Sequence, residues 1–178
     1  MEVAERDTAL RVADLMVSAA RTAPKASGKD KVVSLIVTGD EMMALADETE
    51  KAGREYGEDF FIRDAGNVRN SHCVVLIGVK PEPFGLGSCG MCGFKNCAEM
   101  KKAGADCAFN ITDLGIAIGS AVSVAADHRM DNRVMYSVGR GAVRMGLFPE
   151  DVRVAYAIPL YTGSKSIYFD RNPGAVLR

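Results

Sequence analysis

Four of the five cysteines of this 178-residue chain lie in one glycine-containing stretch, Gly87–Cys107. They are Cys89, Cys92, Cys97 and Cys107, separated by two, four and nine residues. This cluster restricts the path of the chain more than any other feature, because distant sulfurs act together only where the chain doubles back. Cytoplasmic thiols stay reduced, so clustered cysteines there indicate a metal site or catalysis before disulfides.

The residues between the third and fourth cysteines predict how the chain doubles back. Asn96 is a favourable N-cap, and Glu99 follows three positions later, as in a capping box. Gly104 suits the C-terminal end of the helix Cys97–Ala103 that these signals predict. Such a helix carries the chain about 9–10 Å away at ~1.5 Å per residue, and the following residues suffice for the return to Cys107. All four sulfurs can therefore meet at one site.

The spacing favours an iron–sulfur cluster, although the residues leave other occupants open. Structural zinc usually takes two short pairs of ligands, and only the first two cysteines form such a pair. Iron–sulfur clusters accept looser spacing and glycine-rich loops, with Met91 and Phe94 as candidates to shield the site from water. We expect a [4Fe-4S] cluster and keep zinc, a [2Fe-2S] cluster and reactive thiols as alternatives. Cys73, inside an apolar run, is interpreted as a buried thiol.

Length, charge and hydropathy narrow the class of protein. The length fits a single domain, 1–178, into which 84–110 inserts the cysteine segment. A formal net charge of −1 gives no reason to expect nucleic acid or an anionic membrane as a partner. The N-terminus is charged throughout, and the most apolar run, Leu114–Ala126, is shorter than the ~20 residues of a membrane span. We therefore expect a cytoplasmic protein.

The rest of the chain alternates predicted helices with apolar strands. Helices are expected over Glu2–Thr22, Glu41–Tyr56, Asp59–Asn70, Leu114–His128 and Arg140–Gly146. Strands are expected over Lys31–Thr38, Ser71–Val79, Arg133–Val138 and Asp151–Tyr161. Pro159, inside the last of these strands, indicates an edge position or a bulge. Because the strands are apolar throughout, the predicted fold is an α/β (α+β) sheet covered by helices on both faces.

The helix predicted over Leu114–His128 has two further features. Thr112 and Asp113 directly precede it and are candidates to cap its N-terminus. It is apolar nearly all round, which predicts a central buried helix. Gly115 and Gly119 lie one turn apart and would let another backbone approach closely.

Two glycine-containing segments are candidate binding sites for an anionic cofactor. Arg21, Lys25, Ser27 and Lys29 surround a loop after the first helix and are candidates to hold a cofactor phosphate. The alternative is an ordinary solvated loop. The segment VGRGAVRMG (138–146) invites the same interpretation but lacks the full phosphate-loop fingerprint. A tight turn onto a short helix is the simpler interpretation there.

Around the cysteines the sequence resembles the ferredoxin-domain-containing proteins of anaerobic bacteria and archaea. The resemblance is carried by CGMCGFKNCAEM (89–100), ADC (105–107), DLGIAIGSAV (113–122), ARTAPKASGKD (20–30) and PLYTGSKSIYFDR (159–171). It implies a [4Fe-4S] cluster bound by the four clustered cysteines. The Cys-Gly-x-Cys-Gly-x-x-x-Cys start is also similar to the cluster module of membrane electron-transport and corrinoid proteins, in which the fourth cysteine lies further along.

A second similarity is to the flavin-dependent nitroreductase fold. ARTAPKASG (20–28) stands where nitroreductases have an Ala-Pro-Ser loop near FMN, and DLGIAIGSAVSVAADH (113–128) resembles their central dimer helix. The sequence departs from that pattern in two ways. It lacks the N-terminal Arg-Arg-Ser-type flavin signature, and it has Lys25 where serine is usual.

Together these features predict an iron–sulfur redox protein that transfers electrons through its cluster to a redox partner protein. Two alternatives remain. One is an FMN-dependent, nitroreductase-like oxidoreductase fed by the cluster, with FMN held between the 23–29 loop and the second subunit of a homodimer. The other is a zinc-stapled structural or interaction module.

Overall fold

The computed structural model describes residues 2–149 and 151–169. The helices of this part of the chain are α1 (Glu2–Thr22), the 3-10 turn η1 (Ala26–Gly28), α2 (Gly39–Tyr56), α3 (Asp59–Arg69), α4 (Cys97–Lys102), α5 (Ala108–Asp127) and α6 (Tyr136–Arg144). Its strands are β1 (Val32–Val37), β2 (Cys73–Val79), β3 (Asp131–Asn132) and β4 (Val154–Tyr161).

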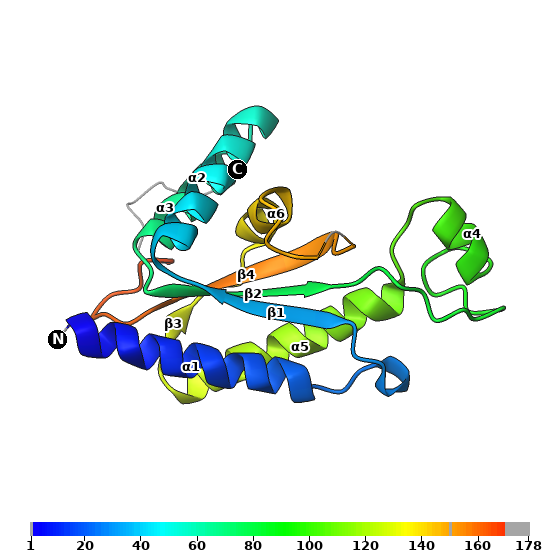
Figure 1. The fold of residues 1–178 in the computed structure, drawn as a ribbon, viewed down its shortest axis with the longest axis horizontal. Helices are drawn as coiled ribbons and strands as arrows, with labels where there is room; N and C mark the ends of the chain where they lie inside the picture. Colours follow the sequence, from blue (N-terminus) through cyan, green and yellow to red (C-terminus); the bar gives the residue numbers. More distant parts are fainter. Residues whose placement is uncertain (1, 150, 170–178) are drawn as a thin grey trace.

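The strands form one antiparallel sheet in the order β1-β2-β4-β3. Helices α1 and α5 lie on one side of this sheet, and α2, α3 and α6 lie on the other (Figure 1). The predicted architecture, a sheet covered by helices on both faces, is therefore confirmed. Between the end of β2 and the start of α5 the chain runs out past the end of the sheet and carries α4 (Figure 1).

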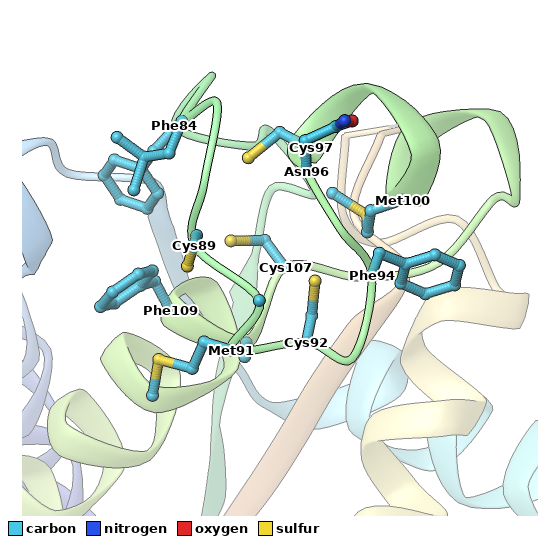
Figure 2. Close-up of a pocket in the computed structure, with 13 residues that line it drawn as sticks. Phe84, Cys89, Met91, Cys92, Phe94, Asn96, Cys97, Met100, Cys107 and Phe109 are labelled. Atoms are coloured by element: carbon cyan, nitrogen blue, oxygen red, sulfur yellow. The ribbon is translucent and has the colours of Figure 1, made fainter.

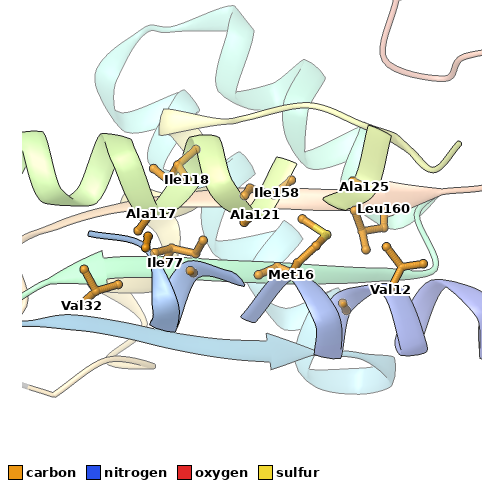
Figure 3. Close-up of a cluster of buried hydrophobic side chains, with 14 of the residues drawn as sticks. Val12, Met16, Val32, Ile77, Ala117, Ile118, Ala121, Ala125, Ile158 and Leu160 are labelled. Carbon is orange, nitrogen blue, oxygen red and sulfur yellow. The ribbon is translucent and has the colours of Figure 1, made fainter. Parts of the chain in front are cut away.

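The strand β2 explains why the sheet needs helices on both faces. All its residues are buried, and successive side chains of a strand point to opposite faces. Val75 and Ile77 pack in the core beneath α1 and α5, whereas Val74 and Leu76 pack in the core beneath α2, α3 and α6. Figure 3 shows the first of these cores, with side chains of α1 and α5 meeting over the strands.

Helix α5 differs from its prediction at its N-terminus. It begins at Ala108, six residues before Leu114, and Cys107 stands at its N-cap position. Thr112 does not cap the helix, because its hydroxyl donates to the Ala108 carbonyl one turn earlier (2.9 Å). The prediction of a cap at Thr112-Asp113 was therefore wrong.

The prediction that α5 is buried all round was also wrong. Leu114, Ala117 and Ala121 face the core, but Ile116 on the opposite side is 41% exposed. Within the described residues no atom comes near a Cβ added at Gly115 or Gly119, so no other backbone approaches there. By length and composition α5 is the one helix in this part of the chain apolar enough to cross a membrane. Its buried face, however, packs on α1 and the sheet as a core helix does.

The strand predicted over Arg133–Val138 was wrong as well. β3 is shorter and lies earlier, at Asp131–Asn132, and Met135 makes only an isolated bridge to Ala157. Helix α6 then begins at Tyr136, so VGRGAVRMG lies mostly inside a helix. Gly139 and Gly141 of this segment lie in the helix at close contacts with β4 and α2, and they do not form a phosphate loop. A Cβ at Gly139 would stand 2.2 Å from the Ala155 carbonyl oxygen.

Pro159 occupies neither an edge strand nor a bulge. β4 lies between β2 and β3, and its register with β2 is continuous through the pair Val74↔Pro159. The Ala157 N–H donates to the Met135 carbonyl (3.0 Å), which lies on the β3 side of β4. The nitrogen of Pro159, two residues later, therefore also faces the β3 side and not β2. β3 pairs only over Asp131–Asn132, and the missing donor of Pro159 therefore leaves no ladder bond unmade.

The fifth cysteine gives a pH-dependent prediction. Cys73 is fully buried in β2, and burial, with a smaller contribution from Asp14, raises the pKa of its thiol from 9.0 to about 12. The unfolded thiol loses its proton first, so this group's contribution to the free energy of unfolding falls as the pH rises from about 9 to about 12. Between about pH 8 and about pH 10 we expect the free energy of unfolding to fall less in Cys73→Ala than in the unaltered protein, as measured by urea unfolding. Equal falls in both proteins would contradict this assignment.

Candidate metal centre

The segment beyond the sheet brings its four cysteines to one pocket. Cys89, Cys92, Cys97 and Cys107 all line it, and no charged side chain of residues 2–149 and 151–169 does. Figure 2 shows the cysteines around the middle of the pocket, with aromatic and methionine side chains on both sides. The apolar walls come from Phe84, Leu86, Met91, Phe94, Met100 and Phe109. Of these, the sequence indicated only Met91 and Phe94 as shields.

Two glycine turns position the first pair of cysteines. Gly90 and Gly93, each directly after a cysteine, have φ angles of 70° and 84°. This left-handed region suits glycine, because a side chain there is strained. The Gly93 N–H donates to the Gly90 carbonyl (2.9 Å) and closes a tight turn around Cys92. Both Cys89 and Cys92 are half-buried.

Helix α4 positions the third cysteine as the sequence predicted. Its N-cap is Asn96, whose side-chain oxygen accepts the Glu99 N–H (2.9 Å), and Cys97 is its first residue. Met100 on its inner face is buried. After Gly104, with φ 68°, the chain returns and delivers Cys107 to the N-cap position of α5. The excursion and return inferred from the caps are confirmed.

The spacing of the thiols bears on what they hold. In the described part of the chain no three Cys, His, Asp or Glu side chains stand close enough to share one metal ion. The space enclosed among the pocket residues is about 10 Å³, room for roughly one water molecule. The donor set nevertheless fits an iron–sulfur cluster, since four thiols line one pocket, no charged or imidazole side chain of the described residues lines it with them, and a cluster is larger than one ion.

Asn110 ties the outgoing limb of the segment to the scaffold. It is 1% exposed in the first turn of α5, and its Nδ2 donates to the carbonyls of Lys80 (3.1 Å) and Glu82 (2.9 Å). These carbonyls have left the β-ladder and need donors from elsewhere. The same helix turn that follows Cys107 thus holds the start of the segment.

Arg153, directly before β4, holds the return limb. Its guanidinium donates to the carbonyls of Gly104 (3.0 Å) and Ala105 (3.3 Å) and to the Asp106 carboxylate (2.7 Å). Three successive residues before Cys107 are therefore fixed by one side chain. No sequence motif singled out Arg153 or Asn110, because both act on backbone carbonyls from distant parts of the chain.

We expect Arg153→Gln to release bound metal to a chelator about threefold to tenfold faster than the unaltered protein. Hydrogen bonds to charged groups contribute ~1.5–3 kcal/mol, and the partial exposure of Arg153 reduces this. Release is followed by the absorbance of an iron chelator. Arg11→Gln, on the exposed face of α1, is the matched control. Equal release rates for the two variants would show that Arg153 does not hold the return limb.

The four residues predicted to hold a cofactor phosphate lie around η1, but their contacts differ. The Lys25 ammonium donates to the carbonyls of Ala20 (3.0 Å), Arg21 (2.8 Å) and Ala23 (2.8 Å). Lys25 therefore caps the C-terminus of α1, and its three N–H groups all have acceptors. Its side chain is 4% exposed, so it is not a solvated loop lysine.

The other three residues are more accessible. Arg21 pairs with Asp30 (2.8 Å), and its side chain is 72% exposed. Ser27 has a φ of 55°, and both Ser27 and Lys29 are exposed. A phosphate-binding role for these residues stays a prediction.

Asp113 links this loop to α5 and was missed as a site residue. Its carboxylate is 5% exposed and accepts the Ala26 N–H through both oxygens (3.0 and 3.2 Å). A carboxylate in an apolar helix signals a buried partner, because an unpaired buried charge is costly. The sequence alone does not identify that partner as a backbone N–H 87 residues earlier.

Comparisons with known proteins identify the family to which the chain belongs. A family model described as uncharacterized protein containing a ferredoxin domain matches residues 103–171. A protein of Archaeoglobus fulgidus, named only as uncharacterized, is 42% identical over 167 residues and covers 89% of each chain. The chain belongs to this ferredoxin-domain family. The residues matched by the family model include Cys107, whereas the other three clustered cysteines precede them.

Solved structures show that this member of the ferredoxin-domain family has a nitroreductase-like fold. A nitroreductase with bound FMN from Desulfitobacterium hafniense superposes with a TM-score of 0.60 at 16% identity, covering 87% of this chain and 78% of that one. A nitroreductase family protein from Clostridium novyi gives a TM-score of 0.53 at 18% identity, covering 91% and 75%. At such identities the likeness concerns the fold alone. The predicted fold class is therefore confirmed.

Proposed function

We propose that this protein is a cytoplasmic iron–sulfur protein that transfers electrons through a [4Fe-4S] cluster. Cys89, Cys92, Cys97 and Cys107 are its ligands, and a redox partner protein exchanges electrons with it. The observation that carries the proposal is the pocket that these four thiols share, in which the described part of the chain places no charged or imidazole side chain. Membership of the ferredoxin-domain family supports an iron–sulfur redox role.

The residues of the pocket have distinct tasks in this proposal. Such a cluster, when bound, supplies one-electron chemistry between two oxidation states. Phe84, Phe109 and Met100 exclude water from the thiols, which lowers the local dielectric and so strengthens the influence of nearby charges. Cys97 also lines an outer groove with Leu86 and Lys101, which offers a surface where a partner protein can dock beside one of the ligands.

Anaerobic purification followed by metal and sulfide analysis tests the proposal. We expect a brown protein with about four iron and four sulfide per chain. Colourless protein with stoichiometric zinc and no sulfide would falsify the electron-transfer proposal. That result would instead support the zinc-stapled structural or interaction module.

A second candidate function is an FMN-dependent oxidoreductase to which the cluster supplies electrons. It is favoured by the fold, since a nitroreductase of the same fold contains FMN. In this candidate the 23–29 loop and the second subunit of a homodimer hold the flavin. A yellow chromophore released on denaturing protein from its native host, together with a dimeric mass in sedimentation, supports it. Cluster-loaded protein without flavin would contradict this candidate and support the electron-transfer protein.

A further inference from the structure

Lys31 is a buried lysine beside the wall of the cysteine pocket. It directly precedes β1 and is 8% exposed. Its ammonium donates to the Glu82 carbonyl on the outgoing limb of the cysteine segment. The same nitrogen lies 4.0 Å from the centroid of the Phe84 ring. Phe84 in turn lines the pocket that contains the four thiols.

The charge of Lys31 lacks a counter-charge. No carboxylate in the described part of the chain lies within ion-pair distance of its ammonium. Buried lysines are rarely tolerated without a partner, because removing an ammonium from water costs several kcal/mol. One carbonyl and one aromatic face offset only part of that cost. The buried ammonium of Lys31 therefore needs a negative charge nearby.

The pocket supplies the negative charge once its cysteines bind as thiolates. A cluster with four thiolate ligands has a net negative charge, and this charge rises by one unit on reduction. Phe84 contacts Lys31 on one side and lines the thiol pocket as well. In a water-poor surrounding a fixed cation acts on such a centre with little screening.

We infer that Lys31 is a positioning residue of the cysteine site. It fixes the outgoing limb through Glu82 and Phe84, and its charge stabilises the anionic, reduced form of the bound cluster. This inference rests on the proposed iron–sulfur function. It predicts that removing the charge lowers the reduction potential, because the reduced form loses more stabilisation than the oxidised form.

Three variants separate the charge of Lys31 from its place in the fold. Lys31→Gln keeps a hydrogen-bond donor for the Glu82 carbonyl but removes the charge. Lys31→Arg keeps the charge. Lys51→Gln removes a solvent-exposed charge from α2 and is the matched control. Lys31→Met, with an unbranched apolar side chain, replaces Lys31→Gln if that variant does not fold.

The experiment measures the midpoint potential of each cluster-loaded variant by anaerobic titration and its melting temperature with and without the cluster. We expect a more negative potential and a smaller stabilisation by the cluster in Lys31→Gln, with Lys31→Arg and Lys51→Gln close to the unaltered protein. A merely structural role would change both melting temperatures equally and leave the potential in place, and that result overturns the inference.

The same measurements separate this inference from the proposal on which it rests. Unaltered protein without iron and sulfide after anaerobic reconstitution contradicts the iron–sulfur function itself. Unaltered protein with a full cluster, together with a Lys31→Gln variant of identical potential, contradicts only the role of Lys31.

Discussion

Replacing Cys107 with serine is expected to lower the iron and sulfide content of the anaerobically purified protein at least tenfold. Iron–sulfur clusters are held by thiolates, and a serine hydroxyl stays protonated at neutral pH and is a harder, weaker ligand. Cys107 is the decisive position to test because it lies farthest in sequence from the other three cysteines and is the most buried of the four. Its placement depends on the return limb held by Arg153.

Cys73→Ala provides the matched control for this experiment. It removes the one remaining cysteine, which is buried in β2 and absent from the pocket lining. We expect it to keep its iron and sulfide, at a cost of about 1 kcal/mol for the atom lost from the core. A Cys107→Ser protein with the full cluster would show that the fourth ligand lies elsewhere in the chain.

Gly139→Ala is expected to lower the free energy of unfolding by about 2–4 kcal/mol, the largest effect that we predict for a single added methyl group. Gly139 lies within α6 where the helix crosses β4, and the new Cβ would stand 2.2 Å from the Ala155 carbonyl oxygen. The three nearest atoms are all backbone atoms of Ala155 and Tyr156, which leaves little room for relaxation. Urea unfolding followed by circular dichroism measures the difference.

Gly115→Ala is the control for Gly139→Ala, because it makes the same change in a helix with open space around it. Nothing lies within 4 Å of the added Cβ in the described structure. Alanine also has a higher helix propensity than glycine. We expect a gain of ~0.5–1 kcal/mol. Similar losses in both variants would show that crowding against Ala155 is not the cause of the loss at Gly139.

The spacing of apolar residues predicted most of the helices and strands. Local capping signals were misleading at the N-terminus of α5. The helices α1, α2 and α3 were found within two residues of their observed ends, because apolar spacing and Pro or Gly punctuation agree there. At α5 the N-cap residues Thr112 and Asp113 indicated a false start. The true start at Cys107 has a β-region backbone but no side-chain cap bond, so it left no signal in the sequence.

The candidate site was predictable in its ligands and less so in its support. Cap signals around Asn96 located α4 because they act within a few residues. The contacts of Arg153, Asn110 and Lys31 join positions 28 to 51 residues apart, and no local rule reports such pairs. Lys25 has contacts that its position in a basic loop did not indicate, since its ammonium donates to carbonyls at the C-terminus of the preceding helix α1.

The start of α5 at Cys107 also has a mechanical consequence. Asp113, which holds the Ala26 N–H, follows Cys107 by under two helical turns, or about 9 Å along the axis. An α-helix transmits displacement along its axis with little compression, because its packed turns resist deformation. The N-cap thiol and the contact to the 23–29 loop therefore lie on the same stiff stretch of helix, and we expect the two regions to move together.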